Sequence, residues 1–152
     1  RLTFTSNRVP NDTIKLSRSD FNYLKFIFRG SSPVANASLQ INFNNDTGNN
    51  YGRYVINNST TNGNVAWWLQ GMSSAIANAG ADTAKDSAIT IKAELAKTPN
   101  GWAGWTETLS YEFVRWGETR WFTSAAITSV NLSSSGNTQF KAGTEIVIYG
   151  AN

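Results

Sequence analysis

The sequence ASLQINFNNDTGNNYGRY occupies residues 37–54. In its first part the apolar residues Leu39, Ile41 and Phe43 alternate with polar ones, as in a strand with one face on a core and the other in water. The next segment, Asn44–Asn50, consists of Asn, Asp, Thr and Gly, which favour tight turns. Because an extended segment restarts at Tyr51, we predict an antiparallel hairpin across this stretch.

Composition limits the class of protein. The chain has 152 residues, 40% of them hydrophobic and 12% aromatic, which predicts a single globular domain over residues 1–152. It contains no Cys, and therefore no disulfide and no Cys-ligated metal. It also contains no His, which excludes Ser-His-Asp and Cys-His nucleophile systems and the HExxH zinc site.

Charge and hydropathy suggest neither a nucleic-acid partner nor insertion into a membrane. The net charge is +3, but only 15% of residues are charged and the basic ones are spread along the chain. Such a diffuse charge is weak evidence for nucleic-acid binding. No apolar run is long enough for a membrane-spanning segment.

The strand-and-turn pattern of residues 37–54 repeats along the chain. Ser87–Leu95 alternates cleanly, and Thr106–Trp116 alternates again before a predicted hairpin tip at Gly117-Glu118. Gly71–Lys85 is predicted to be a long loop. We therefore predict an all-β fold, a two-sheet antiparallel β-sandwich of jelly-roll-like form. The expected core residues are Leu24, Phe26, Leu39, Ile41, Phe43, Ile89, Ile91, Leu109, Tyr111, Phe113, Ile146 and Ile148.

A series of short segments, in order, resembles one protein family. They are YLKFIFRG (23–30), LQINFNNDTGNNY (39–51), AITSVNL (126–132), GN (136–137), FKAGT (140–144) and YG (149–150). The series is similar to β-sandwich domains of tailed-bacteriophage virion proteins, found in tail fibres, head fibres and appendages. In those domains an FNGDTGxNY-like segment precedes AITSIxL and GNFxAGSxxxLYG. The region from Gly71 to Trp105 and the Trp-rich segment after it have no counterpart in this pattern.

The resemblance implies a virion structural protein, either a head-decoration (cement) protein or a tail-fibre appendage. Such a protein attaches to other virion proteins of the capsid or tail, or to the host surface, and is assembled in the host cytoplasm. It implies a homotrimer without catalysis, so neither enzyme activity nor a cofactor is expected. The alternative, from a different class, is a carbohydrate-binding module that uses exposed Trp residues.

Six tryptophans are the most conspicuous candidates for a binding surface. Exposed Trp side chains stack well on sugar faces, whereas buried ones fill cores and subunit interfaces. Trp67 and Trp68 are adjacent, so in a strand they point to opposite faces. Trp102 and Trp105 flank a predicted Gly-rich turn, where exposure is expected. The candidate binding or interface residues are Trp68, Trp102, Trp105, Trp116, Trp121, Phe21 and Tyr23.

Self-association is predicted from the segment Phe21–Phe28. Its apolar residues fall on both faces of a strand, and a sandwich of this size buries only one face of each strand. The second face therefore needs a cover, and another copy of the chain is the simplest one.

Neither a metal site nor a pair of catalytic acids is expected. Residues 44–49 have the composition of a calcium loop but hold one carboxylate and lack the acidic ligand at the loop end, so turn chemistry explains them. Glu107 and Glu112 lie at an odd spacing in one predicted strand, which places them on opposite faces. A glycosidase needs two acids facing the same bond.

Overall fold

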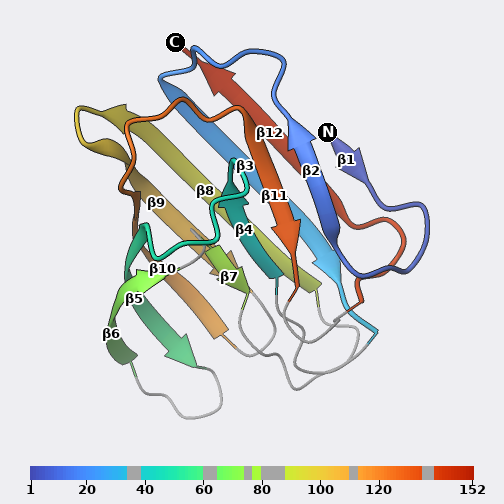
Figure 1. Ribbon diagram of the computed structural model, residues 1–152. Helices are drawn as coiled ribbons and strands as arrows, with labels where there is room; N and C mark the ends of the chain where they lie inside the picture. The colour runs from blue at the N-terminus through green and yellow to red at the C-terminus, as the bar shows by residue number, and fades with distance from the viewer. Residues whose placement is uncertain (34–38, 60–64, 74–76, 80–87, 110–112, 135–138) are drawn as a thin grey trace.

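The computed structural model is a sandwich of two antiparallel β-sheets (Figure 1). It describes residues 1–33, 39–59, 65–73, 77–79, 88–109, 113–134 and 139–152, with the backbone alone for 55, 57–59, 65–73, 77–79 and 113. No residue in these ranges is helical, so no helix there is long and apolar enough to cross a membrane. The predicted fold class is confirmed.

The larger sheet has eight strands. In chain order they are β1 (Leu2–Thr3), β3 (Tyr23–Ser31), β5 (Tyr51–Ser59), β6 (Val65–Ser73), β8 (Ala88–Thr98), β9 (Gly101–Leu109), β10 (Phe113–Trp121) and β12 (Glu145–Ala151). Across the sheet the order is β1-β12-β3-β8-β9-β10-β5-β6, and every neighbouring pair is antiparallel. β8 and β9 form a hairpin with its turn at Pro99-Asn100.

The smaller sheet has four strands and lies in front of the larger one in Figure 1. Its strands are β2 (Asn11–Lys15), β4 (Leu39–Phe43), β7 (Ala77–Ala79) and β11 (Ser129–Ser133). They are ordered β2-β11-β4-β7, again with antiparallel pairing.

The predicted hairpin over residues 37–54 is wrong, although both of its strands and its turn exist. β4 pairs with β11 and β7, whereas β5 pairs with β10 and β6 in the other sheet. The turn between them therefore carries the chain from one sheet to the other. Its tightness comes from Asn44 and Asn45, which take left-handed φ angles of 52° and 57°.

Two further strand predictions need correction. The expected loop Gly71–Lys85 contains the end of β6 and all of β7; residues 74–76 and 80–85 lie outside the described ranges. The expected tip at Gly117-Glu118 lies in the middle of β10, where Gly117 faces Thr106 of β9. A glycine inside a strand is compatible with the ladder, and here it accepts a hydrogen bond from the Thr106 hydroxyl at 3.4 Å.

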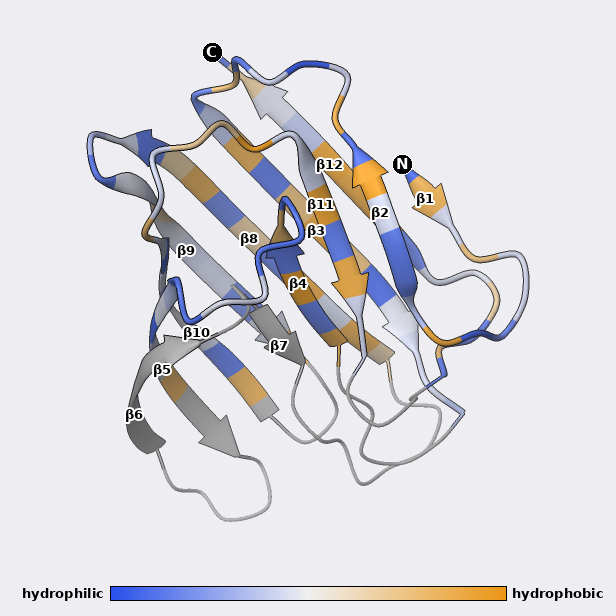
Figure 2. Cartoon of the chain, in the orientation of Figure 1, coloured by the Kyte–Doolittle hydropathy of each residue, from blue (hydrophilic) through white to orange (hydrophobic). Residues whose placement is uncertain are grey.

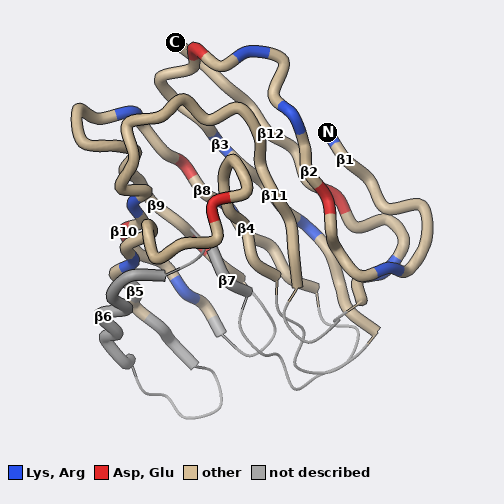
Figure 3. The backbone as a smooth tube through the Cα atoms, viewed as in Figure 1, with Lys and Arg blue, Asp and Glu red and all other residues tan. Residues whose placement is uncertain are grey.

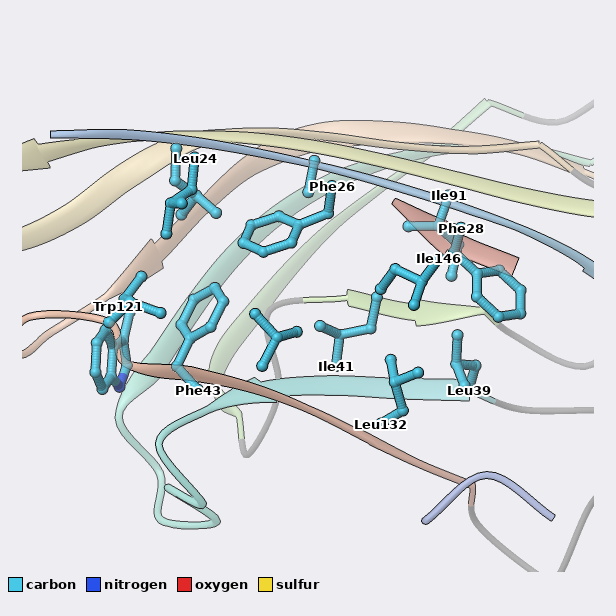
Figure 4. Close-up of a cluster of buried hydrophobic side chains, with 14 of the residues drawn as sticks. Leu24, Phe26, Phe28, Leu39, Ile41, Phe43, Ile91, Trp121, Leu132 and Ile146 are labelled. Atoms are coloured by element: carbon cyan, nitrogen blue, oxygen red, sulfur yellow. The ribbon is translucent and has the colours of Figure 1, made fainter. Parts of the chain in front are cut away.

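The core lies between the two sheets and follows the alternation of each strand. Figure 2 shows hydrophobic bands alternating with hydrophilic ones along β3 and β8. Figure 4 shows Phe26 and Phe28 of the larger sheet facing Ile41 and Phe43 of the smaller one. The predicted core residues that are buried are Leu24, Phe26, Leu39, Ile41, Phe43, Ile89, Ile91 and Ile146. Ile148 and Leu109 are half-buried, and the side chains of Tyr111 and Phe113 fall outside the described part.

An aromatic cluster fastens the sheet-to-sheet crossover to the core. The Tyr51 and Trp121 rings stack at 6.2 Å with an interplanar angle of 13°, and Phe43 lies 5.3 Å from Trp121. The Tyr51 hydroxyl accepts a hydrogen bond from the Phe43 N–H at 2.9 Å. The Asp46 carboxylate accepts one from the Trp121 indole N–H at 2.7 Å. These bonds hold the turn against the end of the core.

Candidate functional site

The outer face of the eight-stranded sheet carries all the large hydrophobic side chains that the described part of the chain exposes. These are Tyr54, Trp105, Phe122 and Tyr149. Side chains alternate between the faces of a strand, and on β9 Trp102 and Thr106 point into the core while Trp105 points outward. Gathering on one face rather than scattering distinguishes these residues from ordinary surface hydrophobics.

Trp105, Glu118 and Tyr54 form one row across three strands. Glu118 of β10 is the pairing partner of both Trp105 on β9 and Tyr54 on β5. Neighbouring strands lie about 4.8 Å apart, so the two aromatic residues originate about 10 Å from each other with a carboxylate between them. Trp105 is 51% exposed and Tyr54 43%, which leaves both rings open to solvent.

A cation and a third ring continue this surface along the sheet. Arg120 pairs with the Glu118 carboxylate, its Nε lying 2.5 Å from Oε1. Gly52 lies opposite Arg120, and a Cβ there would overlap the Phe122 ring. The missing side chain therefore lets Phe122 lie against the sheet. We call Tyr54, Trp105, Glu118, Arg120 and Phe122 the aromatic platform.

Ion pairs surround the platform on the neighbouring strands. Lys92 binds Glu107 at 2.9 Å, and Lys25 binds Glu94, the β8 neighbour of Trp105, at 2.6 Å. The hydrogen bond from Lys25 holds the pKa of Glu94 below its usual value. Figure 3 shows acidic and basic residues interspersed over this sheet rather than grouped by sign. The surface therefore offers hydrogen-bond donors and acceptors beside exposed rings.

Only part of the predicted tryptophan set reaches this face. Trp105 is exposed as expected, and Trp116 is half-buried on the same face, one row away opposite Glu107. Trp102 was expected to be exposed but is 1% exposed, and its indole N–H donates to the Ala125 carbonyl at 3.1 Å. Trp121 is likewise buried in the core. Trp68 lies on β6, where the structure describes the backbone alone.

The two other candidates lie on or beside β3. Tyr23 is half-buried on the outer face, opposite Ala96. Phe21 is half-buried beside Gly150 and packs against the core. The outward positions of β3 carry Lys25 and Arg29 as well as Ile27, so its second face is less apolar than the sequence suggested.

Four platform residues were not predicted from sequence: Tyr54, Glu118, Arg120 and Phe122. Tyr54 and Glu118 could have been found from the alternation of side chains along their strands. Tyr54 lies at an odd spacing from the inward-facing Tyr51 and Arg53, so it points to the outer face. That inference requires the pairing of β5 with β10, which the predicted hairpin did not include.

The described residues offer no group of three His, Cys, Asp or Glu side chains that could hold a metal ion. Asp46, in the expected turn, instead bonds protein donors: Trp121, Asn50 at 3.0 Å and the Gly48 N–H at 3.0 Å. Glu107 forms its ion pair with Lys92, and Glu112 is outside the described ranges.

Comparison with known proteins adds only distant structural likenesses. No family model and no curated protein sequence matches the chain. Among solved structures, the galectin LEC-6 of Caenorhabditis elegans is similar with a TM-score of 0.36 and 12% identity, over 97% of this chain and 99% of that one. A legume lectin-like domain from Entamoeba histolytica is similar with a TM-score of 0.35 and 7% identity, over 98% and 84%. At these TM-scores neither likeness bears on what this chain binds.

Proposed function

We propose that the protein binds carbohydrate through the aromatic platform. The observation that carries the proposal is the row in which Glu118 lies between the exposed rings of Trp105 and Tyr54. A pyranose ring has an apolar C–H face and a rim of hydroxyls, so it needs a flat aromatic surface with acceptors and donors beside it. Glu118 supplies the acceptor and Arg120 the donors.

The charges on the platform favour a sugar over a second copy of the chain. The centres of protein–protein interfaces are depleted of charged side chains. Here the Glu118–Arg120 ion pair lies among the rings, with side chains about half exposed (44% for Glu118, 54% for Arg120). A hydroxylated ligand can exchange hydrogen bonds with this pair, whereas an apolar interface would have to desolvate it.

The open geometry sets the expected strength of binding. The platform is the face of a sheet rather than an enclosed pocket, so it contacts only one side of a sugar. We expect Kd values on the order of 1 mM for a monosaccharide, which corresponds to about 4 kcal/mol. Longer chains that reach both Trp105 and Tyr54 bind more tightly.

The virion assignment remains a second proposal, supported by the resemblance of the sequence segments. A glycan-binding face suits an appendage that attaches a virion to its host surface, without catalysis or a cofactor. The same resemblance supports the homotrimer. Mass spectrometry of purified virions tests this assignment: the protein is expected in stoichiometric copy number, and its absence from the particle refutes it.

A glycan array tests the carbohydrate proposal directly. Trp105→Ala is expected to abolish the signals that the unaltered protein gives. Tyr149→Ala is the matched control, because Tyr149 is equally exposed on the same face but lies on β12, three strands from β9. Equal loss in both variants, or no signal from the unaltered protein, would refute the proposal.

A further inference from the structure

A cavity of about 430 Å³ opens at the edge of the sandwich, between β2 of the smaller sheet and β12 of the larger one. Its apolar lining is formed by Ile14, Leu16, Phe21, Leu24 and Ile148. Two cations, Arg1 and Lys15, also line it, and its lining includes no Asp or Glu. Arg1 is already paired with Glu145 of β12 at 2.6 Å, so Lys15 supplies the positive charge for a ligand. This edge is far from the aromatic platform in the strand order of the sheet.

The edge of β12 beside this cavity is open. β1 covers only its beginning, with Leu2 opposite Ile146 and Thr3 opposite Glu145. From Val147 to Ala151, no strand in the described part of the chain pairs with this side, whereas β3 pairs with the other side. Figure 1 shows β1 as a short strand beside the much longer β12.

The register identifies which backbone groups face the open side. The Phe4 N–H, just after β1, donates to the Thr144 carbonyl at 2.8 Å, so Thr144 points its carbonyl toward the side of β1. The Asn22 N–H, just before β3, donates to the Ala151 carbonyl at 3.0 Å, so Ala151 points toward the side of β3. In an antiparallel ladder such residues recur at every second position. Ile148 and Gly150 therefore direct their N–H and C=O groups to the open side, and they are the β12 residues that line the cavity.

We propose that an extended, acidic peptide segment of a partner protein adds to this edge, antiparallel to β12 and in line with β1. An added strand supplies hydrogen-bond partners for the open backbone groups of Ile148 and Gly150. Every second side chain of that strand faces the cavity, which gives selectivity. Residues of the partner opposite Ile148 and Gly150 place apolar side chains in the cavity. A carboxylate of the partner meets Lys15.

Charge and polarity select this occupant over two others. A second copy of the chain would bring its own Lys15 to the same edge, and like charges would oppose the pairing. A lipid chain would fill the apolar lining but leave the backbone groups of β12 without partners.

Phe21 shapes the inner wall of this site. A Cβ on Gly150 would overlap the Phe21 ring, so the glycine allows the ring to lie directly over β12. The ring is half-buried and packs against the core. Phe21 is therefore expected to contact the added partner strand. It does not contribute to a surface for self-association.

Hydrogen exchange measured by NMR tests the proposal, with a short acetylated peptide of alternating valine and threonine and a glutamate at each end as the probe. The peptide is expected to slow exchange of the Ile148 and Gly150 amides by ~10-fold or more. The amides of Val147 and Tyr149, which face β3, should not change. Unchanged Ile148 and Gly150 amides would overturn the proposal, and so would protection that rises with protein concentration in the absence of peptide.

The charge requirement is tested with two matched variants. Lys15→Glu is expected to weaken binding of the probe several-fold, while Lys97→Glu makes the same charge change on β8, two strands from β12. Equal weakening by both variants would overturn the role of Lys15. Glycan binding should persist in Lys15→Glu, so failure of this site is distinguishable from failure of the platform.

Discussion

Replacing Asp46 tests how the sheet-to-sheet crossover is held. Asp46 is half-buried, and its carboxylate is the acceptor for the indole N–H of Trp121, which is only 2% exposed. Asp46→Ala leaves that buried donor without a partner, which costs about 1–3 kcal/mol. The bonds from Asn50 and Gly48 are exposed and add little, because water replaces them. We therefore expect a loss of about 2 kcal/mol in the free energy of unfolding at pH 7.

The pH dependence of the same effect follows from the pKa of Asp46. Burial alone would raise it, but the hydrogen bonds from Trp121, Asn50 and Gly48 outweigh burial and hold it below its usual value. A lowered folded-state pKa gives stability that is fully present above the unfolded value of about 3.9 and is lost as pH falls through the folded value. The difference between the unaltered protein and Asp46→Ala should therefore shrink in strong acid.

Urea unfolding followed by circular dichroism measures both quantities, with Asp46→Asn as the matched control. Asparagine keeps an amide oxygen that can accept from Trp121, so its loss should be smaller than that of alanine. The reasoning is refuted if Asp46→Ala lies within about 0.5 kcal/mol of the unaltered protein at pH 7. A difference that stays constant down to strong acid would also refute it.

Three further predictions follow from the fold, from the proposed absence of catalysis and from the family resemblance. Gly104→Ala should destabilise the protein by about 2 kcal/mol or more in thermal unfolding, because a Cβ there would overlap the Glu94 carbonyl oxygen; stability equal to the unaltered protein would contradict this. Glu107→Gln should change the free energy of unfolding by less than about 1 kcal/mol, since its ion pair with Lys92 is partly exposed, and polysaccharide turnover that depends on Glu107 would contradict the proposal of a protein without catalysis. Sedimentation equilibrium should show association to a trimer, and a clean monomer at micromolar concentration would defeat that proposal.

The sequence was sufficient to predict many of the strands and much of the core. The alternation in Ser87–Leu95 correctly placed Ile89 and Ile91 inside, because side-chain parity is a local property of a strand. The pairing of strands could not be predicted in the same way. The turn at Asn44-Asn45 has the same local chemistry whether it joins a hairpin or crosses between sheets, and the choice depends on the distant Trp121 and β11.

The exposure of a candidate site residue could be predicted only where the face of the strand that carries its side chain was known. Trp102 and Trp105 were both expected to be exposed because Gly104 was taken as part of a turn. Gly104 instead lies inside β9, where close approach of the Glu94 carbonyl leaves no room for a side chain. With the strand continuous, the spacing of Trp102 and Trp105 puts them on opposite faces, one in the core and one on the platform.

The central claim, that sugars bind on the aromatic platform, is tested most directly by the indole N–H signals of the six tryptophans in a ¹H–¹⁵N spectrum. Assigned by single substitutions, these signals would be followed during titration with an oligosaccharide found on the glycan array. Carbohydrate binding as proposed shifts the signal of Trp105 most, with a smaller shift at Trp116, and leaves the buried Trp102 and Trp121 unchanged. Binding that leaves Trp105 unmoved while other signals shift would contradict the account.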